Sequence, residues 1–82
     1  MKMTRQEIEE KVKTFLIDEM EIDKETVYPA ARLKDDMGID SLDLVDIVVI
    51  VDRIFGFRIK IEELKDVQTF SQFCGYIEKK VG

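Results

Sequence analysis

The segment between Asp40 and Gly56 limits what this chain can fold into more than any other segment. Aspartate is a preferred cap at the start of a helix, and glycine commonly follows the end of one. The apolar run IVVIV at residues 47–51 could also form a buried strand. However, acidic residues at 43, 46 and 52 recur at helical spacing, and no partner strand is evident. The segment therefore predicts a helix from Asp40 or Ser41 to about Phe55. Its expected buried stripe consists of Leu42, Ile47, Val48, Val51 and Phe55.

The remaining sequence predicts three further helices. The stretches TRQE at residues 4–7 and TFSQ at residues 69–72 both have the pattern of a capping box. The first predicts a helix over about residues 4–19, and the second predicts the last helix of the chain. A short helix is expected within residues 59–66. In the last helix, Gly75 suggests a close approach by another helix. The residues expected to face inward from the first and last helices are Ile8, Val12, Phe15, Leu16, Phe70, Phe73, Cys74 and Ile77.

A long connection, residues 20–39, separates the first two predicted helices and contains Pro29 and Gly38. Connections of this length in small domains usually wrap the core or serve function. Five irregularly spaced apolar residues are expected to pin it across the helices: Ile22, Val27, Tyr28, Leu33 and Met37. The expected fold is all-α: a four-helix bundle forming one domain over residues 1–82, with a long first loop and a short third helix.

Composition excludes several classes of function. The 82 residues contain no histidine, so the usual general base and the commonest metal ligand are both missing. The single cysteine, Cys74, is expected in the core and cannot form an internal disulfide. No stretch approaches the length of a membrane span, and the N-terminus has no apolar signal region, which predicts a cytoplasmic protein without membrane insertion. The net charge of −5 and six aspartates between residues 35 and 52, without a basic residue, predict no nucleic-acid binding.

Ser41 is the strongest candidate for chemistry. It lies at the predicted start of a helix, where unpaired N–H groups and the helix dipole favour a phosphate group. No histidine is present to activate the hydroxyl, so a hydrolase triad is excluded and Ser41 is expected to be an acceptor for another enzyme. The alternative is that Asp40 and Ser41 only cap the helix. No metal site is predicted, because the nearby aspartates lack the spacing of a calcium-binding loop.

Three motifs resemble those of the acyl carrier protein family. They are LKDDMGIDSLD at residues 33–43, the acid Asp46 that follows it, and VQT at residues 67–69, and the likeness covers most of the chain. The resemblance implies a carrier, not an enzyme, in which Ser41, flanked by the cap Asp40, receives 4′-phosphopantetheine from coenzyme A. A magnesium-dependent phosphopantetheinyl transferase would attach the group, whose thiol would hold acyl chains as thioesters for fatty acid or related biosynthesis.

The resemblance also implies two further groups of site residues. A monomeric carrier would present an acidic second helix to the transferase and to acyl-loading, condensing and chain-modifying enzymes. The residues implied for this contact are Asp43, Asp46, Val49 and Asp52. The core would shelter the acyl chain, and its implied lining is Leu33, Ile59, Leu64, Val67, Phe73 and Ile77.

The end of the second predicted helix departs from the pattern of the family's fatty-acid members. Arg53, Arg58 and Lys60 follow Asp52 where those members usually stay acidic, and Ile54 and Phe57 add apolar side chains near the partner-facing helix. These departures make a carrier dedicated to a specialised pathway, polyketide or aminoacyl/peptidyl, the alternative. Between these cargoes, the acid before Ser41 and the pair Asp43 and Asp46 favour acyl over aminoacyl or peptidyl groups. An unmodified helical adaptor is the alternative from a different class.

Overall fold

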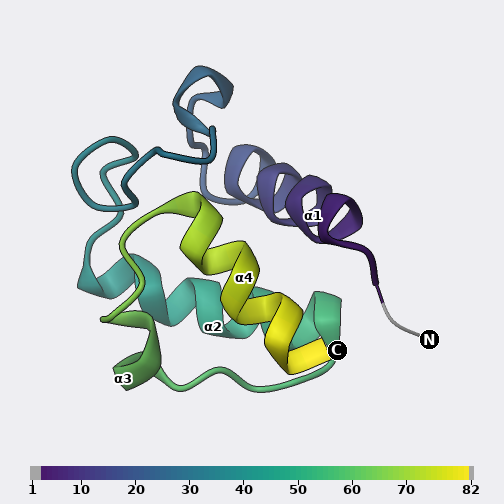
Figure 1. Ribbon diagram of the computed structural model, residues 1–82. Coiled ribbons are helices and arrows are strands. Elements are labelled where there is room, and N and C mark those ends of the chain that lie inside the picture. Colours follow the sequence, from purple (N-terminus) through teal and green to yellow (C-terminus); the bar gives the residue numbers. More distant parts are fainter. Residues whose placement is uncertain (1–2, 82) are drawn as a thin grey trace.

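Four α-helices and one short 3-10 turn form the bundle in the computed structural model, which describes residues 3–81 (Figure 1). This confirms the all-α architecture, the long first connection and the short third helix. Residues 1, 2 and 82 of the expected domain lie outside the described part. The elements are α1 (Arg5–Asp18), the 3-10 turn η1 (Lys24–Thr26), α2 (Ser41–Phe55), α3 (Ile61–Leu64) and α4 (Phe70–Val81).

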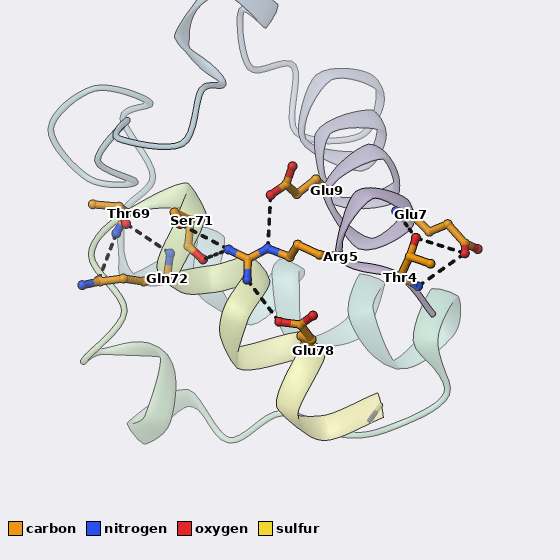
Figure 2. Close-up of polar contacts among 8 residues, drawn as sticks. All are labelled: Thr4, Arg5, Glu7, Glu9, Thr69, Ser71, Gln72 and Glu78. Carbon is orange, nitrogen blue, oxygen red and sulfur yellow. Dashed lines mark hydrogen bonds and ion pairs between the residues drawn. The ribbon is translucent and has the colours of Figure 1, made fainter. Parts of the chain in front are cut away.

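Both predicted capping boxes are confirmed (Figure 2). At α1, the Glu7 N–H donates to Thr4 Oγ1 at 3.1 Å, and the Thr4 N–H donates to Glu7 Oε1 at 3.3 Å. At α4, the Gln72 N–H donates to Thr69 Oγ1 at 3.1 Å, and the Thr69 N–H donates to Gln72 Oε1 at 3.3 Å. Each box satisfies backbone donors that a helix start would otherwise leave unpaired, so the sequence sets these two helix starts locally.

Arg5 joins α1 to α4 (Figure 2). Its guanidinium donates to the Ser71 carbonyl oxygen at 2.8 Å and pairs with Glu9 at 3.1 Å and Glu78 at 3.2 Å. The same side chain covers Gly75, where an added Cβ would lie 3.6 Å from Arg5 Nη1, an ordinary contact. The expectation that Gly75 admits a close helix is therefore wrong, because the flexible end of a side chain lies against it.

The core fills the space between these helices and the long connection. Phe15 of α1 and Phe73 of α4 are both buried and meet edge to face, with ring centroids 6.3 Å apart. From the connection, Val27, Leu33 and Met37 are buried as predicted, and Ile22 is partly buried. Tyr28 was expected to be a further peg, but it is 47% exposed. It begins a tight turn in which the Ala31 N–H donates to its carbonyl, so its neighbours Val27 and Ala31 fill the inward positions.

The long connection is fastened to the start of α4. The N–H groups of Phe70 and Ser71 donate to the carbonyls of Ala31 and Pro29 at 2.9 and 3.0 Å, and the Leu33 N–H donates to Gln68 at 2.8 Å. Thus loop carbonyls satisfy donors in the first turn of α4 that have no partner within the helix. The connection then turns at Gly38, whose φ of +74° suits glycine, and leads directly into α2.

The inner face of α2 differs from the predicted stripe. Ile47, Ile50 and Val51 are buried, whereas Val48 and Phe55 are only partly buried and Leu42 is 78% exposed. The prediction for Leu42 is wrong for a geometric reason. At about 100° per residue, Leu42 lies roughly 140° around the helix from Ile47, so both cannot face the same core. Because α2 is apolar on several sides, its composition alone does not identify which side faces the core.

Candidate functional site

Ser41 is the first residue of α2 and is exposed. The residue before it, Asp40, is the N-cap: its Oδ1 accepts a hydrogen bond from the Asp43 N–H at 3.0 Å. No side-chain hydrogen bond found within residues 3–81 uses the Ser41 hydroxyl. Because the aspartate does the capping, the serine oxygen is available to another molecule at the positive end of the helix dipole.

Asp43 completes a third capping box that the sequence reading missed. Its Oδ2 accepts a hydrogen bond from the Asp40 N–H at 3.1 Å, so the two aspartates cap each other's backbone. The family resemblance implies only partner contacts for Asp43. Two acidic residues three positions apart at a helix start could have predicted this box. Glutamate or glutamine is usual at the position three residues after the cap, and here it is an aspartate. Asp43 therefore fixes the backbone that carries Ser41.

A hollow of about 680 Å³ opens beside Ser41. Three of the six predicted lining residues, Leu33, Leu64 and Val67, contribute to its wall. The other three, Ile59, Phe73 and Ile77, are buried in the core and do not line it. The structure adds apolar wall residues that the sequence did not single out, Ile39 and Leu44, and basic rim residues, Lys34 and Lys65. A group attached to Ser41 would thus have an apolar recess within reach.

One face of α2 combines exposed apolar and acidic side chains. Leu42, Val45 and Val49 are 78%, 47% and 61% exposed, and their spacing of three and seven residues puts them on one side of the helix. Asp46 and Asp52 are exposed on the same side. We call these five residues the α2 face. Three of them, Asp46, Val49 and Asp52, were predicted for partner contact, whereas Leu42 and Val45 were not.

The residues that depart from the family pattern lie close to the end of α2. Arg53 pairs with Glu19, the C-cap residue of α1, so its charge is used within the molecule. Ile54 and Phe57 are partly buried against the core, and the Phe57 ring lies 6.3 Å from that of Phe55. Both keep some exposed area, so they add less apolar surface than fully exposed side chains would. Arg58 and Lys60 are exposed between α2 and α3.

A polar cluster joins α3 to α4, and the sequence analysis did not find it. The Tyr76 hydroxyl donates to Glu63 Oε2 at 2.9 Å, and Lys80 Nζ lies 3.5 Å from Glu63 Oε1. The Tyr76 hydrogen bond, with Lys80 nearby, lowers the pKa of Glu63. Partial burial and the Glu63 carboxylate raise the pKa of Tyr76 to about 12. The cluster thus holds an ionised Glu63 against a protonated Tyr76 at neutral pH.

Cys74 lies in the core, as the sequence predicts, with no exposed surface. Burial raises the pKa of its thiol to about 12. Since the thiolate is the nucleophilic form, this side chain is a packing group.

Comparisons with known proteins agree on one family. A family model described as the phosphopantetheine attachment site matches residues 10–77. The chain is 39% identical to the acyl carrier protein of Thermotoga maritima over 96% of its length and 98% of that protein. It is 36% identical to the acyl carrier protein of Solidesulfovibrio magneticus, over 92% of this chain and 96% of the relative. It is 33% identical to the acyl carrier protein of Chlorobium phaeobacteroides, over 95% of this chain and 100% of the relative.

No helix within residues 3–81 has the length and apolar character needed to cross a membrane.

Proposed function

The chain belongs to the acyl carrier protein family, and we propose that its 4′-phosphopantetheine group is attached to the Ser41 hydroxyl. Members of the family are carrier proteins and not catalysts. The observation that supports this assignment most strongly lies at the start of α2. Asp40 and Asp43 cap the helix there, and Ser41 stays exposed. The adjacent hollow gives an attached arm and its cargo an apolar wall to contact. These residues fit the group that the family carries.

Attachment requires chemistry that this chain cannot supply alone. The Ser41 oxygen forms a bond to the phosphorus atom that bears the pantetheine, while the bond from that phosphorus to the adenosine 3′,5′-bisphosphate portion of coenzyme A breaks. A base must take the serine proton; this chain has no histidine to serve as that base, and we propose that the transferase supplies it. The bound group supplies a terminal thiol that holds acyl groups as thioesters. The protein's own part is to present the hydroxyl on a fixed, capped helix start.

The mass of the protein after incubation with coenzyme A, magnesium and a broad-specificity transferase tests this proposal. The wild type should gain one phosphopantetheine group and Ser41→Ala should gain none, with a stability loss within ~1 kcal/mol because Asp40 still caps α2. Ser71 is the only other serine, so Ser71→Ala is the matched control and should be modified normally. Modification of Ser41→Ala would contradict the site. An unmodified wild type would favour the adaptor alternative.

We further propose that the α2 face docks the transferase and the acyl-loading, condensing and chain-modifying enzymes. Exposed Leu42 and Val49 supply apolar contact area, and Asp46 and Asp52 supply charge for basic partner surfaces. Asp43 is a poor probe of docking because it also caps α2. We propose that the protein is a monomeric carrier for fatty acid or related acyl-chain synthesis. We expect it to work in the cytoplasm, where its donor, coenzyme A, is available.

Reversing one charge on the α2 face tests the docking proposal. Asp46→Lys should slow modification by about tenfold at low salt, and the difference should shrink as salt rises. Folding should be unaffected, because Asp46 is exposed and takes no part in the capping box. Glu10→Lys, an exposed position on α1, makes the same change in net charge away from Ser41 and is the control. Equal rates for both variants across the salt series would contradict a docking role for this face.

A further inference from the structure

The short helix α3 forms one wall of the hollow beside Ser41. Leu64, the last residue of α3, and Lys65 and Val67 just after it line the hollow together with Leu44 of α2. Figure 1 shows α3 beneath α2, between a long connection from the end of α2 and a second connection that leads to α4, and α3 contacts α2. A helix of four residues is not stable by itself, and no side chain caps its start at Lys60. Its position therefore depends on what holds it to its neighbours.

Two side chains of α4 restrain α3 by binding one side chain of α3. Glu63 of α3 accepts the 2.9 Å hydrogen bond from Tyr76 and pairs with Lys80 at 3.5 Å, both on α4. Lys80 Nζ also lies 5.6 Å from the centroid of the Tyr76 ring, within the range of a cation–π contact. Within residues 3–81, these are the side-chain hydrogen bonds and ion pairs that connect α3 to another helix. We call Glu63, Tyr76 and Lys80 the α3 latch.

The helix α3 carries both Glu63 of the latch and Leu64 of the hollow's wall, so a movement of α3 changes both. Leu64, which is buried at the wall, is the neighbour of Glu63, which is held by the latch. A chain that extends past Leu64 moves α3 outward, because Leu64 is buried and the core behind it is close-packed. That movement separates Glu63 from Tyr76 and Lys80. Each added methylene gains buried apolar area only until the latch must open.

We propose that the α3 latch sets the length of acyl chain that the carrier shelters. The inference rests on the proposed attachment at Ser41 and extends it by assigning residues that determine cargo length. Glu63, Tyr76 and Lys80 act through α3 and do not line the hollow, so they are positioning residues. Weakening the latch therefore lets longer chains fit without changing the residues that line the hollow.

The first arm of the test measures the melting temperature of carriers loaded with butyryl, hexanoyl, octanoyl and decanoyl groups, each relative to its own unmodified form. In the wild type, stabilisation should rise and then level off within the series. In Tyr76→Phe, which loses only the hydroxyl, and in Glu63→Ala, the plateau should move about two carbons further. Glu63→Gln keeps an oxygen that accepts from Tyr76 and should fall between Glu63→Ala and the wild type.

Matched controls exist beside each latch residue. Glu62→Gln in α3 and Lys79→Met in α4 change exposed neighbours without side-chain bonds to the other helix, so both should keep the wild-type plateau. A structural defect unrelated to the latch would lower every melting temperature and leave the plateau unmoved. Identical plateaus in Tyr76→Phe, Glu62→Gln and the wild type would overturn the proposal.

The second arm uses unmodified protein and needs no acyl group. Amide hydrogen exchange at residues 64–67 should be about fivefold faster in Tyr76→Phe than in Glu62→Gln, because a lost net hydrogen bond of ordinary strength changes a local opening equilibrium by that order. Unchanged exchange would overturn the latch. If the wild type cannot be loaded, the proposed attachment fails while this arm still measures α3. If it loads and only the plateaus coincide, the latch inference fails alone.

Discussion

The α1–α4 side of the bundle and the α2–α3 side are held together by different means. Between α1 and α4, buried Phe15 and Phe73 meet edge to face, and Arg5 makes contacts along the length of α4 from Ser71 to Glu78. On the other side, α3 contacts α2, and a hollow opens between the start of α2, the end of α3 and the long connection; α3 is a four-residue helix whose start has no side-chain cap. The exposed serine is on this second side, at the rim of the hollow.

This difference separates two requirements that conflict in a small protein. A carrier needs a stable body that several enzymes can recognise, and it needs a recess that can admit and release cargo. A chain of 82 residues has one core. In this molecule the Phe15–Phe73 contact and the Arg5 contacts join α1 to α4, and none of these three residues borders the hollow. Local stability is expected to follow the same division, with α3 opening more readily than α1 or α4.

Removing the aromatic contact should produce the largest change in stability. Phe73→Ala should destabilise the protein by about 3–5 kcal/mol, because it deletes a buried ring packed against Phe15. Leu44→Ala, at the partly buried wall of the hollow, should cost less than ~2 kcal/mol. Urea unfolding measures both values.

Ile77→Val serves as a milder probe of the α1–α4 side if Phe73→Ala does not fold, with an expected cost of about 0.5–1.5 kcal/mol. A larger loss for Leu44→Ala than for Phe73→Ala would reverse the proposed division between the two sides.

Removing the Arg5 contacts should have an intermediate effect. Arg5→Met keeps an apolar stem but loses the hydrogen bond to Ser71 and the pairs with Glu9 and Glu78. We expect a loss of about 1–2 kcal/mol, since the side chain is 35% exposed and solvent screens its ion pairs. Lys13→Met is the control on the exposed face of α1 and should stay within about 0.5 kcal/mol of the wild type. Equal unfolding free energies for the two variants would show that Arg5 does not hold these helices together.

Filling Gly75 should have the smallest effect and the opposite sign. Gly75→Ala should stabilise the protein by about 0.5–1 kcal/mol, because alanine favours the helix and its Cβ would make an ordinary contact with Arg5. Gly38→Ala is the contrasting control. That position has open space but a φ of +74°, so the same substitution should destabilise the loop before Ser41. A destabilised Gly75→Ala, measured by thermal or urea unfolding, would mean that α1 and α4 need a bare backbone there.

The sequence predicted best where the signals are local. Capping boxes at Thr4 and Thr69, the glycine after α2 and the exposed helix start at Ser41 involve residues at most four apart, and each was found without knowledge of the fold. Contacts between distant residues left no such pattern. Glu63 and Tyr76 are separated by 13 positions, and either residue by itself looks like an ordinary surface or core position.

The faces of α2 show a second limit. The helix is apolar on more than one side, so its composition predicts a helix but does not say which apolar residues are buried. Leu42 was assigned to the core and is exposed, while Ile50 is buried and was not in the predicted stripe. Three of the six residues predicted to line an acyl pocket do not border the hollow beside Ser41, for a related reason. Ile59, Phe73 and Ile77 are apolar and inward-facing, but whether an inward side chain borders a hollow depends on how neighbouring helices pack.

The burial of Cys74 has a consequence for the fate of the cargo. A thioester passes readily from one thiol to another when the second is ionised and within reach. Burial raises the pKa of Cys74 to about 12, so its thiol stays protonated at pH 7, and the sulfur has no exposed surface. The protein's own thiol is therefore no competitor for the acyl group. Transfer of the acyl group from one thiol to another must use a thiol of another molecule.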